Sequence, residues 1–220
     1  MMNKSLMKTL RHPAFWASLA VAPLASAQSV DQLIPHKVRL ESVDYLGKRA
    51  IKMTEEGVVT NGEAYAIVKD AVFHNGAVEL ELAGRPAAGA AGGARGFVGV
   101  AFRLQDGQYE YIYLRPTNGR ADDQVRRNHS TQYGSHPKFD FAELRKESPE
   151  KYESYVDLEP GVWTRVRIVV QGTTAKLFVH GASQPALIVP DLKLGDASGA
   201  VALWIGPGTE GYFNGLSIKP

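Results

Sequence analysis

Residues 97–115 read FVGVAFRLQDGQYEYIYLR, and this stretch decides the fold class. Apolar residues alternate with other residues in both halves, as at Val100 and Phe102 in the first half. A period of two residues is typical of a β-strand with one buried face. Asp106-Gly107 separates the two halves and favours a tight hairpin turn, because glycine tolerates the positive φ that such turns need. The stretch therefore predicts two antiparallel strands.

The alternation also predicts which side chains share a face of these strands. The inward face is expected to hold Val98, Val100, Phe102, Leu104, Glu110, Ile112 and Leu114. The outward face is expected to hold Gly99, Ala101, Arg103, Tyr109, Tyr111, Tyr113 and Arg115.

Further strands are expected on both sides of this hairpin. Alternating runs occur at 77–82, 163–170, 174–180 and 200–205, and a turn at Gly47 separates two shorter runs. Only 141–152 has helical character, and Pro149 interrupts it. Many short strands without alternating helices predict an all-β fold, a jelly-roll sandwich of two antiparallel sheets.

The N-terminus has the three parts of a secretory signal peptide. Lys4, Lys8 and Arg11 precede an apolar stretch at 14–24, which ends in Ala25-Ser26-Ala27. We expect cleavage after residue 27, a single domain over 28–220, and export to the periplasm or the medium. The alternative is a buried N-terminal helix. No later stretch is apolar enough to span a membrane.

The charge balance changes once this leader is removed. The whole chain has 25 Lys and Arg against 23 Asp and Glu, and its pI is near 8.7. Three of the basic residues lie in the leader, so 22 remain against 23 acidic residues. The mature chain is therefore not basic, which argues against a nucleic-acid partner. The sequence has no cysteine, so no disulfide stabilises the exported domain.

Five runs carry a resemblance to a known superfamily. They are VFHNGAVEL (72–80), GVWTRVRIVV (161–170), AKLFVHG (175–181), GAVALW (199–204) and GYFNGLSI (211–218). Together with 97–115 they resemble the concanavalin A-like lectin/glucanase superfamily, and most closely its laminin-G-like and 3-keto-disaccharide hydrolase-type modules. The resemblance implies a jelly roll that binds or cleaves carbohydrate. His180 replaces the usual Asn before Gly181, and the loop between Arg115 and Tyr155 matches no catalytic motif of the family.

A concave sheet in this fold would present its outward residues to a ligand. Tyr109, Tyr111 and Tyr113 offer flat apolar rings to sugar C–H bonds. Arg103 and Arg115 offer guanidinium groups to carboxylates and vicinal hydroxyls. We expect these five residues to bind substrate. The alternative is that the tyrosines pack beneath the long loop as a second core.

Two segments interrupt the strand pattern. The Gly/Ala-rich segment 83–96 is expected to be a loop that buries little. The longer segment, 116–160, is rich in polar and aromatic residues and is expected to be a functional loop. Its candidate residues are Asn118, Arg120, Asp122, Asp123, Arg126, Arg127, Asn128, His129, Gln132, Tyr133 and His136.

The hypothesis for catalysis uses this loop. His129 or Tyr133 would act as general acid or base, and Arg127 or Arg126 would orient the substrate. Asn118, Arg126, Gln132 and His136 would bind the sugar. Such a set suits β-elimination of a uronate or hydrolysis. The alternative is a solvated polar loop without a catalytic role.

Other chemistry receives weaker support. Glu79 and Glu81 share a sheet face, but neither belongs to a glycosidase motif, and Glu110 points inward. Asp122-Asp123 could join a calcium site, and no other cofactor is indicated.

Three functions remain open at this point. The first is a carbohydrate-binding module, and the second is a small glycoside hydrolase or polysaccharide lyase. The third is a laminin-G-like interaction domain.

Overall fold

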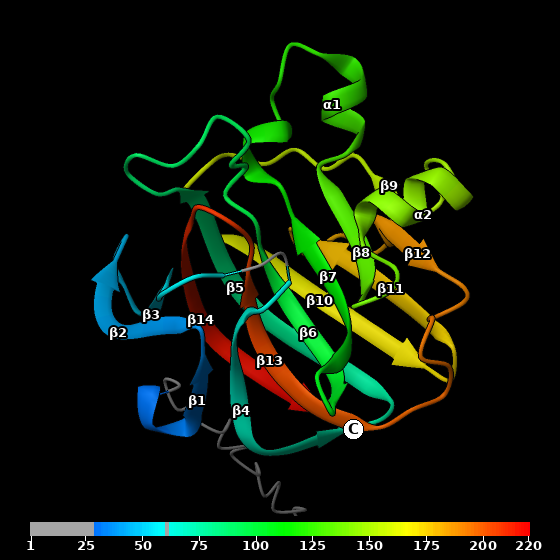
Figure 1. Ribbon diagram of the computed structural model, residues 1–220, viewed down its shortest axis with the longest axis horizontal. Coiled ribbons are helices and arrows are strands. Elements are labelled where there is room, and N and C mark those ends of the chain that lie inside the picture. The colour runs from blue at the N-terminus through cyan, green and yellow to red at the C-terminus, as the bar shows by residue number, and fades with distance from the viewer. Residues whose placement is uncertain (1–28, 60–61) are drawn as a thin grey trace, which may run out of the picture.

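Two antiparallel sheets of seven strands each stack face to face in the computed structural model, which describes residues 29–59 and 62–220 (Figure 1). We call them sheet A and sheet B. The predicted leader and its cleavage site lie outside the described residues. The prediction of an all-β sandwich of two antiparallel sheets is confirmed.

Sheet A contains the strands predicted from residues 97–115. Its order is β1 (Leu33–His36), β4 (Ala64–Phe73), β13 (Gly199–Ile205), β6 (Val98–Gln105), β7 (Gln108–Leu114), β8 (Thr131–His136) and β9 (Glu153–Ser154). Sheet B has the order β12 (Leu187–Val189), β11 (Thr174–Val179), β10 (Thr164–Gln171), β5 (Gly76–Pro86), β14 (Thr209–Lys219), β3 (Lys48–Glu55) and β2 (Val38–Tyr45).

The β6–β7 hairpin has the turn that its sequence predicts. Gln105 pairs with Gln108, and the two residues between them have positive φ, 50° at Asp106 and 75° at Gly107. Two consecutive residues with positive φ give the turn a twist that matches the twist of the strands. The turns at Gly47 and Gly172 likewise join β2 to β3 and β10 to β11.

The main core lies between the sheets. Val100 and Ile112 of sheet A pack in one cluster with Leu80 and Ile168 of sheet B, and all four side chains are buried. These residues occupy the inward positions of the alternating pattern. The pattern therefore placed the core correctly over most of the predicted strands.

Helices are few and short. They are the 3-10 helices η1 (Val30–Gln32) and η2 (Pro116–Asn118) and the α-helices α1 (Gln124–Asn128) and α2 (Phe141–Glu147). Both α-helices lie at the same end of the molecule (Figure 1). The predicted helical segment 141–152 forms α2 and ends before Pro149, because a residue that precedes proline disfavours the helical conformation. Within the described ranges, no helix is long and apolar enough to cross a membrane.

The segment 116–160 is not the long loop that we expected. It contains η2, α1, β8, α2 and β9. Strand β8 pairs with β7, with Thr131 opposite Leu114 and His136 opposite Tyr109. The two ends of β8 are about 17 Å apart at the usual rise per residue. Residues of this segment therefore reach two different ends of sheet A.

Candidate functional site

The tyrosines of β7 form a packed cluster on the outer face of sheet A. Tyr109, Tyr111 and Tyr113 are at most 4% exposed and pack with Tyr65 and Trp204. The Tyr111 and Tyr113 rings stack with their centroids 5.4 Å apart. The expectation that these rings line an open groove is wrong for Tyr109 and Tyr111, and the alternative of a second core is correct. Their side chains fill the space that a ligand would need.

One end of this cluster borders a mainly apolar cavity of about 440 Å³. The buried rings of Tyr113 and Trp204 and the half-buried rings of Phe97 and Phe141 line it. Small residues of the Gly/Ala-rich segment, including Gly93, complete the lining. This segment was expected to bury little. Its small side chains instead leave the cavity open.

A second, polar cavity of about 470 Å³ adjoins the first. The two share Gly93, Phe97 and Phe141 in their linings, so we treat them as one hollow with an apolar and a polar half. The polar half is lined by Arg95, Arg115, Asn118, Asp123, Val125, Arg126, His129 and Arg145 as well. Size and lining are those of a small-molecule site.

Capped helices position two of the four arginines of the polar half, Arg126 and Arg145. Asp123 caps α1 by accepting a hydrogen bond from the Arg126 amide at 2.7 Å. Asp140 caps α2, which carries Phe141 and Arg145, by accepting hydrogen bonds from two backbone amides. Such caps satisfy amides that a short helix leaves unpaired. The two helices therefore hold their side chains toward the same hollow.

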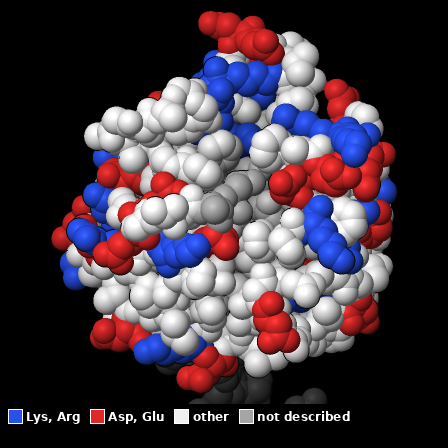
Figure 2. Space-filling view, viewed as in Figure 1, with Lys and Arg blue, Asp and Glu red and all other residues white. Residues whose placement is uncertain are grey.

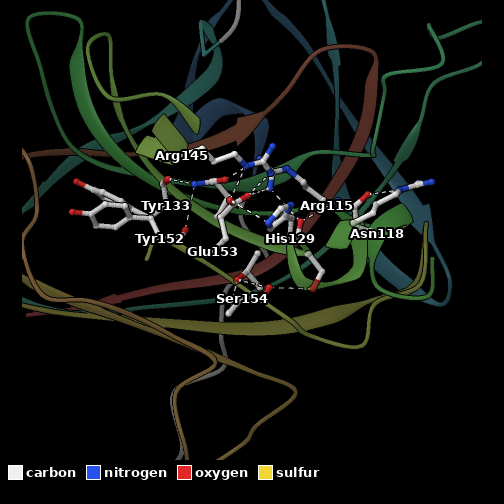
Figure 3. A network of polar contacts seen from close by, with 12 residues as sticks. Arg115, Asn118, His129, Tyr133, Arg145, Tyr152, Glu153 and Ser154 are labelled. Carbon is white, nitrogen blue, oxygen red and sulfur yellow. Dashed lines mark hydrogen bonds and ion pairs between the residues drawn. The ribbon is translucent and has the colours of Figure 1, made fainter. Parts of the chain in front are cut away.

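Arg115 is the centre of a polar network at the base of the hollow (Figure 3). Its guanidinium donates to Glu153 Oε1 at 2.7 Å, and to Gln132 Oε1 and the Tyr113 hydroxyl at 2.9 Å each. Arg145 converges on the same carboxylate. Burial opposes the charge of Glu153, but the hydrogen bonds from Arg145 and Arg115 prevail and lower the pKa of Glu153. Glu153 is therefore ionised, and both of its carboxylate oxygens accept hydrogen bonds from these two guanidinium groups.

His129 lies beside this network. Its Nε2 is 3.6 Å from Glu153 Oε2, and its side chain is 15% exposed. Burial is the main reason that the pKa of His129 is lowered, and the attraction of Glu153 only partly offsets it. His129 is therefore uncharged at neutral pH, and it lines the hollow as the sequence predicted for a functional residue.

Arg103 does not belong to this site. It adopts φ 55°, and the register of β6 against β7 shifts between Phe102 and Gln105. This irregularity turns Arg103 toward the interior, where it donates to the carbonyls of His74 at 2.9 Å and Gly172 at 2.7 Å and to that of Gly195. Leu104 takes the outward place, against the tyrosine cluster. Simple alternation assigned both residues to the wrong face.

Tyr133 is buried in the main core. It lies on β8, where alternation points it inward, and it is fully buried. Its hydroxyl donates to Glu110 Oε2 at 2.6 Å and accepts from the Lys193 amide at 2.8 Å. Burial is the main reason that the pKa of Tyr133 is raised far above its ordinary value. The prediction that Tyr133 acts as acid or base on a ligand at this face is therefore wrong.

The remaining predicted residues divide between the hollow and other places. Arg126 and Asn118 line the hollow. Gln132 is buried and holds Arg115 rather than facing a ligand. Arg127 donates to the Ala121 carbonyl and does not line the hollow. His136 stacks on Tyr109 at the opposite end of β8, with the ring centroids 4.9 Å apart.

The predicted carboxylate and metal chemistry gains no support. Glu79 and Glu81 lie on β5 of sheet B and pair with lysines, Lys219 and Lys48. Asp123 is engaged as a helix cap. Over residues 29–59 and 62–220, no three His, Asp or Glu side chains gather as metal ligands would. Asp122-Asp123 therefore remains an unsupported calcium hypothesis.

Sequence reasoning missed five of the aromatic and arginine side chains that line the hollow. They are Arg95, Phe97, Phe141, Arg145 and Trp204. Trp204 ends the run GAVALW, and its period-2 position puts it on the same face as the tyrosines. Arg95 lies in the Gly/Ala-rich segment, and only the folded chain brings it into one lining with residues of α1 and α2.

Comparison with known proteins supports the fold and no more specific relationship. No family model and no curated protein matches the sequence. A carbohydrate binding module from Bacillus subtilis, CBM66, superposes with a TM-score of 0.57 at 9% identity, over 86% of this chain and 96% of that one. A Bacillus subtilis protein of unknown function with a galectin-like fold superposes with a TM-score of 0.52 at 8% identity, over 85% and 88% of the two chains. The chain therefore has the galectin-like, concanavalin A-like jelly-roll fold.

Proposed function

We propose that this protein is a carbohydrate-binding module whose site is the hollow beside Tyr113. One observation carries the proposal. Half-buried aromatic side chains, Phe97 and Phe141, wall a cavity that continues into a pocket lined by hydrogen-bond donors. Sugars need this combination, because their C–H faces pack on aromatic rings while their hydroxyls bind polar groups. The fold shared with the Bacillus subtilis carbohydrate binding module supports the same assignment.

Binding without cleavage is the better supported activity. A retaining glycosidase needs two carboxylates about 5–5.5 Å apart, and an inverting one needs them roughly 6.5–9.5 Å apart. Among the described lining residues of the hollow, Asp123 is the only carboxylate, and it caps α1. Glu153, just behind the lining, is held by two arginines with a lowered pKa. Neither group is suited to act as a proton donor.

A lyase or hydrolase is the second candidate function, and His129 is the observation that favours it. Its uncharged imidazole lines the hollow near Arg115 and could accept a proton from a bound sugar. Turnover of an oligosaccharide that His129→Ala lowers by about 10²-fold or more would support catalysis. Tight binding with no turnover in either protein would support the binding module.

Calorimetric titration with a panel of neutral and acidic oligosaccharides tests the binding proposal. Phe97→Ala and Phe141→Ala should each weaken binding by about 1–2 kcal/mol, roughly five- to thirtyfold, because each removes an aromatic wall. Phe178→Ala is the matched control, since Phe178 is a half-buried ring on β11 in sheet B and lines neither half of the hollow. Equal affinities of all four proteins, or no binding of any sugar, would reject the proposal.

We also propose that the protein is exported from the cytoplasm. Its support is the basic segment with Lys4 and Lys8, the apolar stretch at 14–24 and the Ala25-Ser26-Ala27 site. N-terminal sequencing of protein from the periplasm or the medium should find a start at Gln28 or within a few residues. Recovery of the chain from the cytoplasm with Met1 intact would contradict it.

A further inference from the structure

Two arginines in the polar half of the hollow lack an acidic partner. Over residues 29–59 and 62–220, neither Arg95 nor Arg126 forms an ion pair with a carboxylate. Arg95 Nη1 donates to the carbonyls of Gly92 at 2.7 Å and Ala94 at 3.1 Å. Arg126 donates to Asn118 Oδ1 at 2.9 Å and to the Thr117 carbonyl and hydroxyl at 3.1 Å each. Both guanidinium groups are therefore held in place by neutral acceptors.

Several other arginines of the surface do pair with carboxylates. Arg120 pairs with Asp157 and Glu159, and Arg85 pairs with Glu210. Such pairing is the usual way in which a folded chain neutralises neighbouring charges. Among the described residues, Arg127 and Arg167 also form no ion pair, and the Asp123 carboxylate accepts a hydrogen bond from the Arg126 backbone amide. Arg95 and Arg126 are distinguished by lining the same hollow.

The cations of the hollow also repel one another. Burial lowers the pKa of Arg95, and the nearby charges of Arg126 and Arg115 lower it further. Four guanidinium groups line the polar half, against the carboxylates of Asp123 and Glu153. The hollow thus has a formal charge of +2, whereas 22 basic and 23 acidic residues follow position 27.

The surface view shows where these cations lie. Lys and Arg atoms are exposed at the end that carries α1 and α2, with Asp and Glu atoms beside them (Figure 2). Repulsion among clustered cations is relieved when an anion binds between them, so such a cluster favours a negatively charged ligand. Guanidinium groups in particular match the two oxygens of a carboxylate or a sulfate.

We infer that the hollow takes an acidic glycan, with a sugar ring against Phe97 and Phe141 and its carboxylate or sulfate ester against Arg95 and Arg126. This inference rests on the proposed function and adds the class of sugar. The aromatic and the basic residues adjoin through their shared lining, so one sugar unit can contact both.

The test compares acidic oligosaccharides with matched neutral ones. Hexuronate oligomers would be titrated by calorimetry, each beside its carboxyl-reduced form, which keeps the ring stereochemistry and removes the charge. Sulfated oligosaccharides and their desulfated forms are the second arm. At least one acidic oligomer should bind about tenfold or more tightly than its neutral form, because hydrogen bonds to a charged group are the stronger ones. Raising the salt concentration should weaken only the acidic ligand.

Variants locate the effect. Arg95→Gln and Arg126→Gln should each lower affinity for the acidic oligomer about tenfold more than they lower affinity for the neutral form. Arg127→Gln is the matched control, because it removes one charge from the same helix and its side chain does not line the hollow. An equal loss in Arg127→Gln would reduce the effect to net charge and overturn the inference.

The remaining outcomes separate the two proposals. Binding of neutral and acidic forms with equal affinity would overturn the inference and leave the binding module standing. No binding of any oligosaccharide would overturn both. Inorganic sulfate that binds as tightly as the acidic oligomer would show an anion site without sugar recognition, which also overturns the inference.

Discussion

Arg103 lies in β6 and Arg115 directly follows β7, and both are buried, at 1% and 4% exposure. They lie at opposite ends of these strands. Arg103 donates to backbone carbonyls of three different loops, so no donor is directed toward a cavity with an aromatic wall. Arg115 shares Glu153 with Arg145 and lines the hollow. The same residue type thus closes the fold at one end and borders a site at the other.

The difference teaches what makes a buried arginine part of a site. A guanidinium that is saturated by backbone carbonyls contributes to stability, because its removal leaves those carbonyls unpaired. A guanidinium with further cations nearby contributes to a positive electrostatic potential, which attracts a negatively charged ligand. Burial by itself does not distinguish the two ends.

Replacement of Arg103 should have the largest effect. Arg103→Leu leaves the carbonyls of His74, Gly172 and Gly195 without this donor and should lower the free energy of unfolding by about 3–5 kcal/mol. Thermal denaturation should show a fall in Tm of roughly 10 °C. Arg165→Leu, whose side chain is 66% exposed, is the control and should stay within about 0.5 kcal/mol. A stable Arg103→Leu protein with weakened glycan binding would reverse the comparison.

Removal of the Tyr133 hydroxyl should lower stability less than replacement of Arg103. Tyr133→Phe removes the hydrogen bonds to Glu110 and from the Lys193 amide and should cost about 1–3 kcal/mol of stability. Glycan affinity should not change, because the ring lies in the main core. Tyr155→Phe, at a residue that is 48% exposed, provides the control. Lost turnover with unchanged stability would instead restore the catalytic hypothesis for Tyr133.

Glu153 and Glu110 should make the stability of the protein depend on pH in opposite directions. The pKa of Glu153 is lowered, so its contribution to stability is present above its unfolded value near 4.5 and lost as pH falls toward the folded value. Burial raises the pKa of Glu110, so its contribution is present at low pH and lost as pH rises through the folded value.

Urea denaturation between pH 3 and 7 measures this contrast. Glu153→Gln should flatten the loss of stability on the acid side, whereas Glu110→Gln should steepen it. Each slope should change by less than one proton per molecule, which is the limit for a single group. Identical effects of the two variants would contradict the assignment of the two environments.

His129 should have the smallest effect. Its lowered pKa leaves it uncharged at pH 7, and protonation below its ordinary value of 6.5 would add one positive charge to the hollow beside Arg115, Arg145 and Glu153. Affinity for an acidic oligosaccharide should therefore rise by about two- to fivefold in wild type as pH falls, the size of a partly exposed charge interaction. His129→Gln should lack this rise and melt normally. A similar rise in both proteins would assign it to another group.

The sequence by itself determined the sheet architecture and most of the inward face of β6 and β7. Period-2 alternation and the Asp106-Gly107 turn are local signals, and local signals suffice for strands and hairpins. The helix at 141–147 was also within reach, because Pro149 sets its end. His129, predicted to be catalytic, and Arg115, Arg126 and Asn118, predicted to bind substrate, all line the hollow, and these roles stay predictions.

Only the tertiary structure decided the composition of the site. Alternation cannot register an irregularity such as the one at Arg103, which moves a side chain to the other face of the sheet. It also could not show that Tyr133 lies on a strand, because β8 depends on pairing with β7 rather than on its own pattern. The hollow itself joins Arg95, Phe97, Phe141 and Trp204 across more than a hundred residues of chain. Contacts between residues so far apart in sequence depend on how the sheets and loops pack, and the periodicity of the sequence gives no information about that packing.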